Sequence, residues 1–173
     1  ARGLALDTVA GEGEEFPIFS QFWVRKPGKK ARDITLYALL ESPSVTGAYQ
    51  FVIEAGDETV ATVKACLFPR RDVKKSGMAP LCSMFLHGEN GTATAGDFRP
   101  EVHQADGLLI HNGRGEWIWR PLDAGKMLRI NAYVDDCPQG FGLLQRDRDY
   151  QHYQDTVARY EKRPSVWVRP LGK

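Results

Sequence analysis

Residues 97–121 hold the side chains whose types and spacing best fit chemistry. Four polar residues that could carry or tune acid–base chemistry stand together here, and they are Glu101, His103, Gln104 and Asp106. Trp117 and Trp119 follow two positions apart, so in an extended strand both rings would project from one face of a sheet. Carboxylates beside aromatic faces are typical of a carbohydrate cleft, since rings cover the apolar faces of sugars and charged groups bond their hydroxyls. The alternative is that both tryptophans are core residues, which is the more common role of tryptophan in strands.

Glycoside hydrolysis is one reaction that such a cleft could support. It needs one carboxylic acid to protonate the leaving oxygen and a second carboxylate as base or nucleophile. Glu101 and His103 share a strand face by period two, so His103 could position or electrostatically tune Glu101. Without further evidence, each of these carboxylates is expected to be a solvated surface charge and not a catalytic group.

The same stretch resembles a known family. Arg99 to His103 read RPEVH, and residues 115–122 read GEWIWRPL, as in the periplasmic glucan biosynthesis proteins OpgG/OpgD (MdoG/MdoD). Further blocks keep the order and spacing of that family over nearly the whole chain: EEFP at 14–17, SPSVTGAY at 42–49, GFGLLQRDRDY at 140–150 and RPSVWV at 163–168.

The resemblance implies a fold and a place in a longer protein. Family members have a large antiparallel β-sandwich of the galactose-mutarotase-like type, followed by an immunoglobulin-like domain. We therefore expect a mainly all-β fold with a short helix near the C-terminal end. Residues 1–173 would be part of one glucan-binding β-sandwich domain, with the immunoglobulin-like domain absent. The resemblance places the protein in the periplasm, although this sequence shows no signal peptide. We expect the segment on its own to be unstable or to associate through open sheet edges.

The resemblance also implies an activity, and one residue departs from it. Some family members resemble inverting β-1,2-glucan hydrolases, and related ones transfer or cyclise glucan chains. Their general acid is the aspartate after Glu-Val-His, where this chain has Gln104 followed by Ala105. An amide cannot donate a proton near neutral pH, so most of that contribution should be lost, on the order of a hundredfold. Three explanations stay open: Asp106 or Glu101 takes the acid role, the protein binds glucan without cleaving it, or the residue is an engineered or divergent change.

Candidate binding residues follow from the same interpretation. The expected sugar platforms are the aromatic residues Tyr49, Trp117, Trp119 and Tyr133. The expected hydroxyl partners are Arg99, Gln145, Arg146 and Asp147, with His103 beside them. The expected ligand is a β-1,2-glucan or a related glucose polymer. The rival hypothesis is a non-catalytic glucan-binding or scaffold protein that presents chains to a membrane-bound glucan synthase.

Composition excludes several other classes of protein. The formal net charge of +1 gives no electrostatic reason to expect nucleic acid as a partner. The sequence contains no run of 18 apolar residues and therefore predicts no transmembrane segment. Four scattered histidines without ligand spacing predict no metal, and no motif predicts a cofactor.

Periodicity predicts mostly strands. Residues 48–55 and 59–68 should form a hairpin around Gly56-Asp57, and residues 127–134 alternate like a strand with one wetted face. Residues 149–161 carry the one helical pattern, which Pro164 ends. Cys66 and Cys82 stand in apolar, strand-like surroundings that favour core positions.

Overall fold

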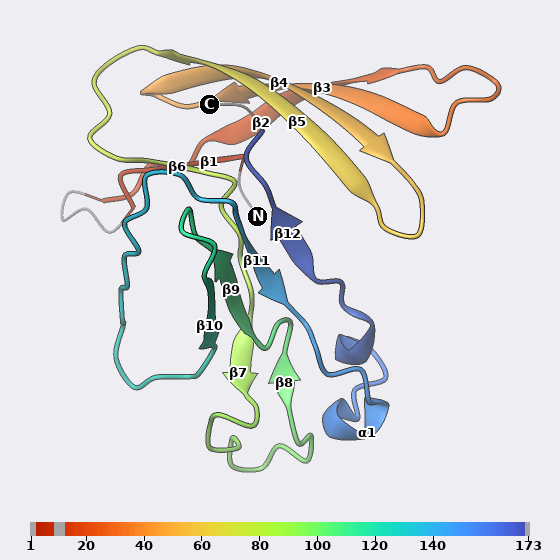
Figure 1. Cartoon of the computed structure of the whole chain (residues 1–173), viewed down its shortest axis with the longest axis vertical. Helices are drawn as coiled ribbons and strands as arrows, with labels where there is room; N and C mark the ends of the chain where they lie inside the picture. The colour runs from red at the N-terminus through yellow and green to blue at the C-terminus, as the bar shows by residue number, and fades with distance from the viewer. Residues whose placement is uncertain (1–2, 9–12, 172–173) are drawn as a thin grey trace. The chain divides into compact units, whose positions relative to one another are not determined.

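The computed structural model describes residues 3–8 and 13–171, and their regular secondary structure is almost entirely antiparallel β-strand (Figure 1). The chain divides into two compact units, residues 1–80 and residues 81–173. The predicted fold class, mainly antiparallel β with one short helix near the C-terminal end, is confirmed.

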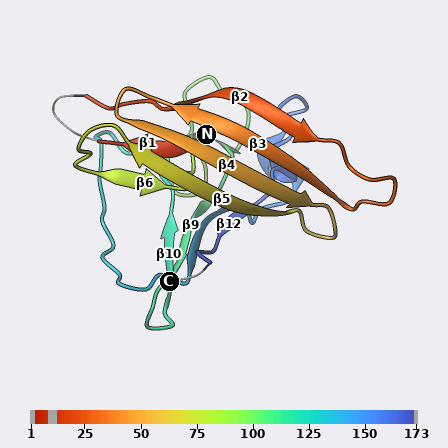
Figure 2. The ribbon, with the colours of Figure 1, turned by 90° about the horizontal axis from the view of Figure 1, so that it is seen from above.

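The first unit is built on a four-stranded sheet in the order β2-β3-β4-β5, whose long strands are seen in Figure 2. Its strands are β2 (Ile18–Arg25), β3 (Asp33–Glu41), β4 (Val45–Glu54) and β5 (Val60–Pro69), and a small pair joins β1 (Leu4–Leu6) to β6 (Ser76–Met78). The predicted hairpin is confirmed as β4 and β5, which pair along their full lengths from Val45–Pro69 to Glu54–Val60. Alternating β-branched and aromatic residues bounded by Gly56-Asp57 explain this hairpin.

Tyr49 lies in the core of this first unit, and the prediction that it forms a sugar platform is not supported. Only 6% of the residue is exposed, and its ring packs edge-on against Phe19 and stacks on Phe51. Its hydroxyl donates to the carbonyl oxygen of Gly3 at 3.1 Å. A buried tyrosine with a satisfied hydroxyl is a core residue, so we leave Tyr49 out of the proposed binding residues.

The second unit holds a four-stranded sheet in the order β10-β9-β11-β12. Its strands are β9 (Gly107–His111), β10 (Trp117–Pro121), β11 (Gly140–Leu144) and β12 (Val166–Val168). A short pair joins β7 (Phe85–His87) to β8 (Val102–His103), and the chain then forms α1 (Tyr150–Tyr153) and the 3-10 helix η1 (Tyr160–Lys162). A small core of Val102, Tyr153 and Tyr160 lies between these elements.

The helix predicted over 149–161 is much shorter in the structure. Asp149 caps the start of α1 by accepting from the Gln151 backbone N–H, as its type favours. The helix ends at Tyr153, because Gln154 adopts a left-handed conformation with φ of 51°. The Asp155 carboxylate then accepts the backbone N–H of Ala158 and so competes with helical hydrogen bonding. In the described residues no helix is long and apolar enough to cross a membrane.

The strand predicted over residues 127–134 is absent. Residues 127–134 pair with no strand in the described part of the chain, and Leu128 and Val134 are 84% and 96% exposed. An alternating pattern forms a strand only where a neighbouring strand supplies hydrogen-bonding partners. The prediction failed because the sequence pattern does not reveal such a neighbour.

The prediction that Cys66 and Cys82 are core residues is wrong, because both are free and exposed. Cys66 lies on β5, which among the described residues pairs with β4 alone and therefore forms an edge of its sheet. An apolar sequence neighbourhood does not ensure burial at a sheet edge.

Candidate functional site

A buried carboxylate–imidazole pair lies at β8. Glu101 directly precedes this strand and His103 ends it, and the two side chains share a face as period two predicts. The His103 Nε2 atom lies 2.6 Å from a Glu101 carboxylate oxygen and donates to it, since a carboxylate only accepts. Glu101 and His103 are 8% and 2% exposed. The His103 ring stacks on Phe85 and meets Tyr153 edge-on, so its orientation is fixed by packing.

Asp106 joins this pair to the end of β11. One carboxylate oxygen accepts the backbone N–H groups of Arg146 and Asp147. The other lies 3.7 Å from His103 Nδ1, which is too far for a hydrogen bond. Within the described residues this buried Nδ1 has no hydrogen-bond partner.

A second carboxylate–imidazole pair lies beside the first and faces solvent. Asp147 Oδ2 and His152 Nδ1 are 2.6 Å apart, and the His152 side chain is 54% exposed. The hydrogen bond to Asp147 raises the pKa of His152, with smaller contributions from the charges of Asp149 and Glu101. Burial acts to raise the pKa of Asp147, but hydrogen bonds from the Asp149 backbone N–H and from His152 outweigh it and lower that pKa.

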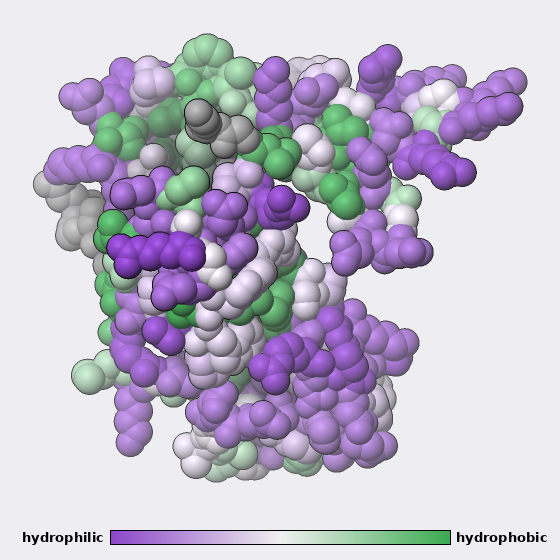
Figure 3. All heavy atoms as spheres, viewed as in Figure 1, coloured by the Kyte–Doolittle hydropathy of each residue, from purple (hydrophilic) through white to green (hydrophobic). Residues whose placement is uncertain are grey.

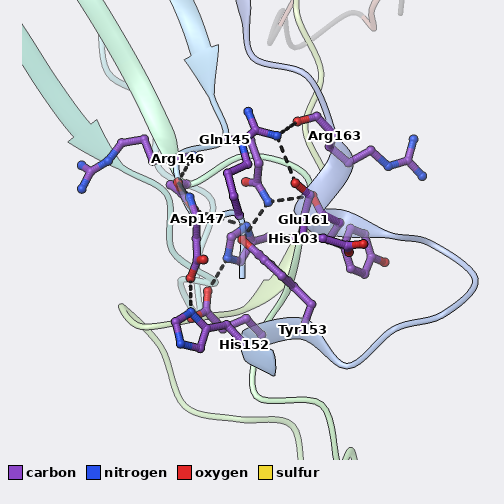
Figure 4. A network of polar contacts seen from close by, with 12 residues as sticks. His103, Gln145, Arg146, Asp147, His152, Tyr153, Glu161 and Arg163 are labelled. Carbon is purple, nitrogen blue, oxygen red and sulfur yellow. Dashed lines mark hydrogen bonds and ion pairs between the residues drawn. The ribbon is translucent and has the colours of Figure 1, made fainter. Parts of the chain in front are cut away.

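The two pairs meet at one point of the second unit. One oxygen or nitrogen atom each from Glu101, Asp147 and His152 lies within 4.8 Å of the others. Figure 4 shows Asp147 directed at His152, with His103 and Tyr153 alongside. Hydrophilic residues gather over the surface around α1 and η1 (Figure 3). We name Glu101, His103, Asp106, Asp147 and His152 the polar cluster.

The polar cluster can hold a proton on a solvent-facing imidazole between carboxylates. Glu101, Asp147 and His152 also have donor atoms suited to a divalent cation. Asp147 and His152 are already joined by a hydrogen bond through Nδ1, so a cation would meet His152 through Nε2 or would replace that hydrogen bond. The absence of a metal stays a prediction.

Gln104 occupies a structural position beside the polar cluster. Its backbone N–H donates to the Met84 carbonyl at 2.9 Å, and its side-chain oxygen accepts the Met84 N–H at 3.3 Å. The amide therefore continues the contact between the β7 and β8 segments. A carboxylate at this position could accept the same N–H.

The two tryptophans lie on one face of β10, as period two predicts. Trp117 is 59% exposed and stacks on His111, with ring centroids 4.1 Å apart and planes at 4°. The guanidinium of Arg146 lies over the Trp119 ring, 5.1 Å from its centroid. We name Trp117, Trp119 and His111 the aromatic face. The Arg146 backbone N–H also binds Asp106, so Arg146 contacts both Trp119 of the aromatic face and Asp106 of the polar cluster.

Tyr133 does not join the aromatic face. Its hydroxyl accepts from Arg120 Nε at 2.8 Å, and Arg120 alternates with Trp119 along β10. Tyr133 therefore lies toward the opposite face of the sheet. There it lines a groove of about 830 Å³ together with Ile110, Ile118 and Phe141.

Gln145 is placed inside the unit and not at its surface. The residue is 2% exposed, and its amide nitrogen donates to the Tyr153 hydroxyl at 2.7 Å and to the Tyr160 carbonyl at 3.1 Å. Gln145 supports the small core behind the polar cluster.

Arg99 is held in ion pairs. Its guanidinium lies 2.7 Å from Asp97 and 2.6 Å from Asp155, so it ties the loop after β7 to the turn after α1. Hydrogen bonds from Arg99 lower the pKa of Asp97 to about 2.

Sequence reasoning missed His152 as a site residue. It lies 49 residues after His103, and the four histidines look scattered along the chain. The available signal is local: Asp149 is a helix N-cap type, and a short helix after it turns His152 back toward Asp147.

Comparison with known proteins points to one family. The profile of the family described as periplasmic glucan biosynthesis protein, MdoG, matches residues 1–173. The chain is 56% identical over 172 residues to glucans biosynthesis protein G of Shewanella baltica and to glucans biosynthesis protein G 1 of Shewanella oneidensis. It is 55% identical to the probable glucans biosynthesis protein D of Shewanella oneidensis. Each match covers 99% of this chain and 32% of the relative, so the chain spans about a third of their length.

Proposed function

This chain belongs to the periplasmic glucan biosynthesis protein family, and on that premise we propose that its second unit binds the glucose chains that the protein helps to make or process. The proposed ligand is a β-1,2-linked glucan, and the proposed location is the periplasm. The linkage type rests on the family resemblance. A membrane-bound glucan synthase is a proposed partner.

The observation that carries this proposal is that Arg146 joins the aromatic face to the polar cluster. The Arg146 side chain covers Trp119, while its backbone N–H binds Asp106. A sugar ring stacked on the exposed Trp117 would thus have charged hydrogen-bonding groups within the same unit. Flat apolar surface beside fixed polar groups is what a sugar ring requires, because it presents apolar C–H faces and hydroxyl edges.

Whether the protein also cleaves or transfers glucan depends on a proton donor. Gln104 stands where the family resemblance places the acid, and its amide is bonded to Met84. This observation favours a second candidate function, a non-catalytic glucan-binding or scaffold protein. The retained Glu101, His103 and Asp106 favour an enzyme, with inverting β-1,2-glucanase or transglycosylase chemistry as the family analogy.

Isothermal titration of the full-length protein with β-1,2-glucan tests the proposed binding. We expect Trp117→Ala to weaken binding about tenfold, which corresponds to about 1.4 kcal/mol of lost contact. Trp23→Ala is the matched control, since Trp23 is similarly exposed at 51% but lies on β2 of the first unit. Equal effects of the two substitutions, or no binding by the unsubstituted protein, would contradict the proposal.

Product release separates the two candidate functions. The unsubstituted protein and Gln104→Asp should be assayed side by side for reducing ends released from β-1,2-glucan. Release only by Gln104→Asp would identify a binding protein whose cleft is intact and whose acid is lost. Release by the unsubstituted protein would identify an enzyme that uses another acid.

A further inference from the structure

We propose that His152 is the proton donor to the glycosidic oxygen when a bound glucan chain is cut, and that Asp147 positions it. This inference rests on the proposed function of the second unit. It makes the protein an enzyme despite Gln104.

Accessibility within the polar cluster singles out His152. Glu101 and His103 are 8% and 2% exposed, and their side chains are bonded to each other. Asp106 accepts backbone N–H groups on one oxygen and faces His103 with the other. The His152 side chain is 54% exposed, and within the described residues no hydrogen bond reaches its Nε2.

The hydrogen bond to Asp147 fixes how His152 can act. Nδ1 donates to the carboxylate, so the remaining ring nitrogen, Nε2, carries the proton that is free to move. When that proton leaves, the neutral imidazole keeps Nδ1–H and its bond to Asp147, so the ring does not have to turn. A carboxylate that orients an imidazole in this way is a common arrangement in general acid–base catalysis.

Three carboxylates favour the charged form of the imidazole. Asp147 contributes most to the raised pKa of His152, and Asp149 on the same segment and Glu101 before β8 add to it. A histidine with an unperturbed pKa near 6.5 is mostly neutral at pH 7, and these neighbours shift it toward the protonated form that an acid requires.

The proposed step balances as a hydrolysis. The Nε2 proton moves to the glycosidic oxygen as the bond between that oxygen and the anomeric carbon breaks, and the electron pair stays on the oxygen. A water oxygen adds to the anomeric carbon, its surplus proton passes to bulk water, and His152 regains a proton from solvent. One water is consumed for each bond cut.

Glu101 has a supporting role in this step. Its carboxylate reaches within 4.8 Å of His152, whereas the two groups of an inverting enzyme stand about 6.5–9.5 Å apart across the sugar. Glu101 is therefore too close to act from the opposite face. Its negative charge stabilises the imidazolium and the positive charge that develops on the sugar.

The test uses the full-length protein and compares His152→Gln with Gln151→Ala, an exposed neighbour on α1. Reducing ends released from β-1,2-glucan are measured as a function of pH, and binding is measured by titration. We expect His152→Gln to lower kcat about a hundredfold or more while Kd changes less than threefold. The unsubstituted protein and Gln151→Ala should lose kcat/KM at alkaline pH as the imidazole loses its proton, and His152→Gln should lack this alkaline limb.

The outcomes separate this inference from the function on which it rests. If the unsubstituted protein binds glucan but releases no product, the inference is overturned and glucan binding stands. The same holds if His152→Gln keeps its kcat within threefold or retains the alkaline limb. If no β-1,2-glucan binds, the proposed function fails and the inference fails with it.

Discussion

Removing the Glu101 carboxylate should destabilise the second unit strongly. Glu101 and His103 form a buried pair with 2.6 Å between nitrogen and oxygen, and their side chains are 11% and 2% exposed. His103 Nδ1 already has no partner within the described residues, so Glu101→Ala would leave both ring nitrogens without one. Removing one partner of a buried pair costs about 3–5 kcal/mol, and we expect a loss near the lower end.

Two further variants separate charge from hydrogen bonding. Glu101→Gln keeps an acceptor for His103 and should cost only about 1 kcal/mol, because a neutral hydrogen bond is roughly half as strong as a charged one. The double variant Glu101→Leu with His103→Phe removes both polar groups and can keep the ring stacked on Phe85. The double variant should lose less free energy of unfolding than Glu101→Leu and His103→Phe lose in sum when each is made alone, by about 1–2 kcal/mol.

The measurement is urea unfolding of the full-length protein, followed by a probe that reports on residues 81–173. Each variant's free energy of unfolding is compared with that of the unsubstituted protein under the same conditions. A loss below about 0.5 kcal/mol for Glu101→Ala would show that His103 finds water or another partner at no cost, and that the buried pair does not stabilise the second unit.

Packing and pH supply the remaining predictions. A Cβ added at Gly140 would lie 2.6 Å from the Trp167 ring, so Gly140→Ala should cost about 1–3 kcal/mol in chemical denaturation. Gly91→Ala meets nothing closer than 3.9 Å and should change stability by less than about 0.5 kcal/mol. The pKa of His152 is raised in the folded protein, so the extra stability of the charged His152–Asp147 pair is fully present below the unfolded pKa and is lost as pH rises through the folded pKa, while the neutral imidazole keeps its Nδ1–H bond. His152→Gln should therefore lower the free energy of unfolding more at pH 5.5 than at pH 9. An equal loss at both pH values would count against a charged His152–Asp147 pair.

The sequence predicts those elements whose signals are local. The β4–β5 hairpin follows from strand-forming residues around Gly56-Asp57, and it forms as expected. The pattern at 127–134 is just as regular, yet no strand forms there, because pairing depends on a neighbour that a local pattern does not specify. The helix predicted over 149–161 starts at Tyr150, close to its predicted beginning, and ends early, because Gln154 turns left-handed and Asp155 competes for backbone N–H groups.

The candidate site is partly predictable for the same reason. Period two brings Glu101 beside His103 and Trp117 beside Trp119, and both pairs share a face in the structure. The place of His152 in the site depends on tertiary structure, because a short helix brings its side chain back to Asp147. Burial, likewise, cannot be predicted from the local sequence. The sequence predicts ligand contacts at Tyr49 and Gln145, but both residues are buried and support the core.

Hydrogen exchange of the full-length protein with and without β-1,2-glucan is the sharpest test of glucan binding by the second unit. We expect slower amide exchange in β9, β10 and residues 140–153, where the aromatic face and the polar cluster lie. We expect no change in the sheet from β2 to β5. Protection confined to that first-unit sheet, or no protection anywhere at saturating glucan, would contradict glucan binding by the second unit.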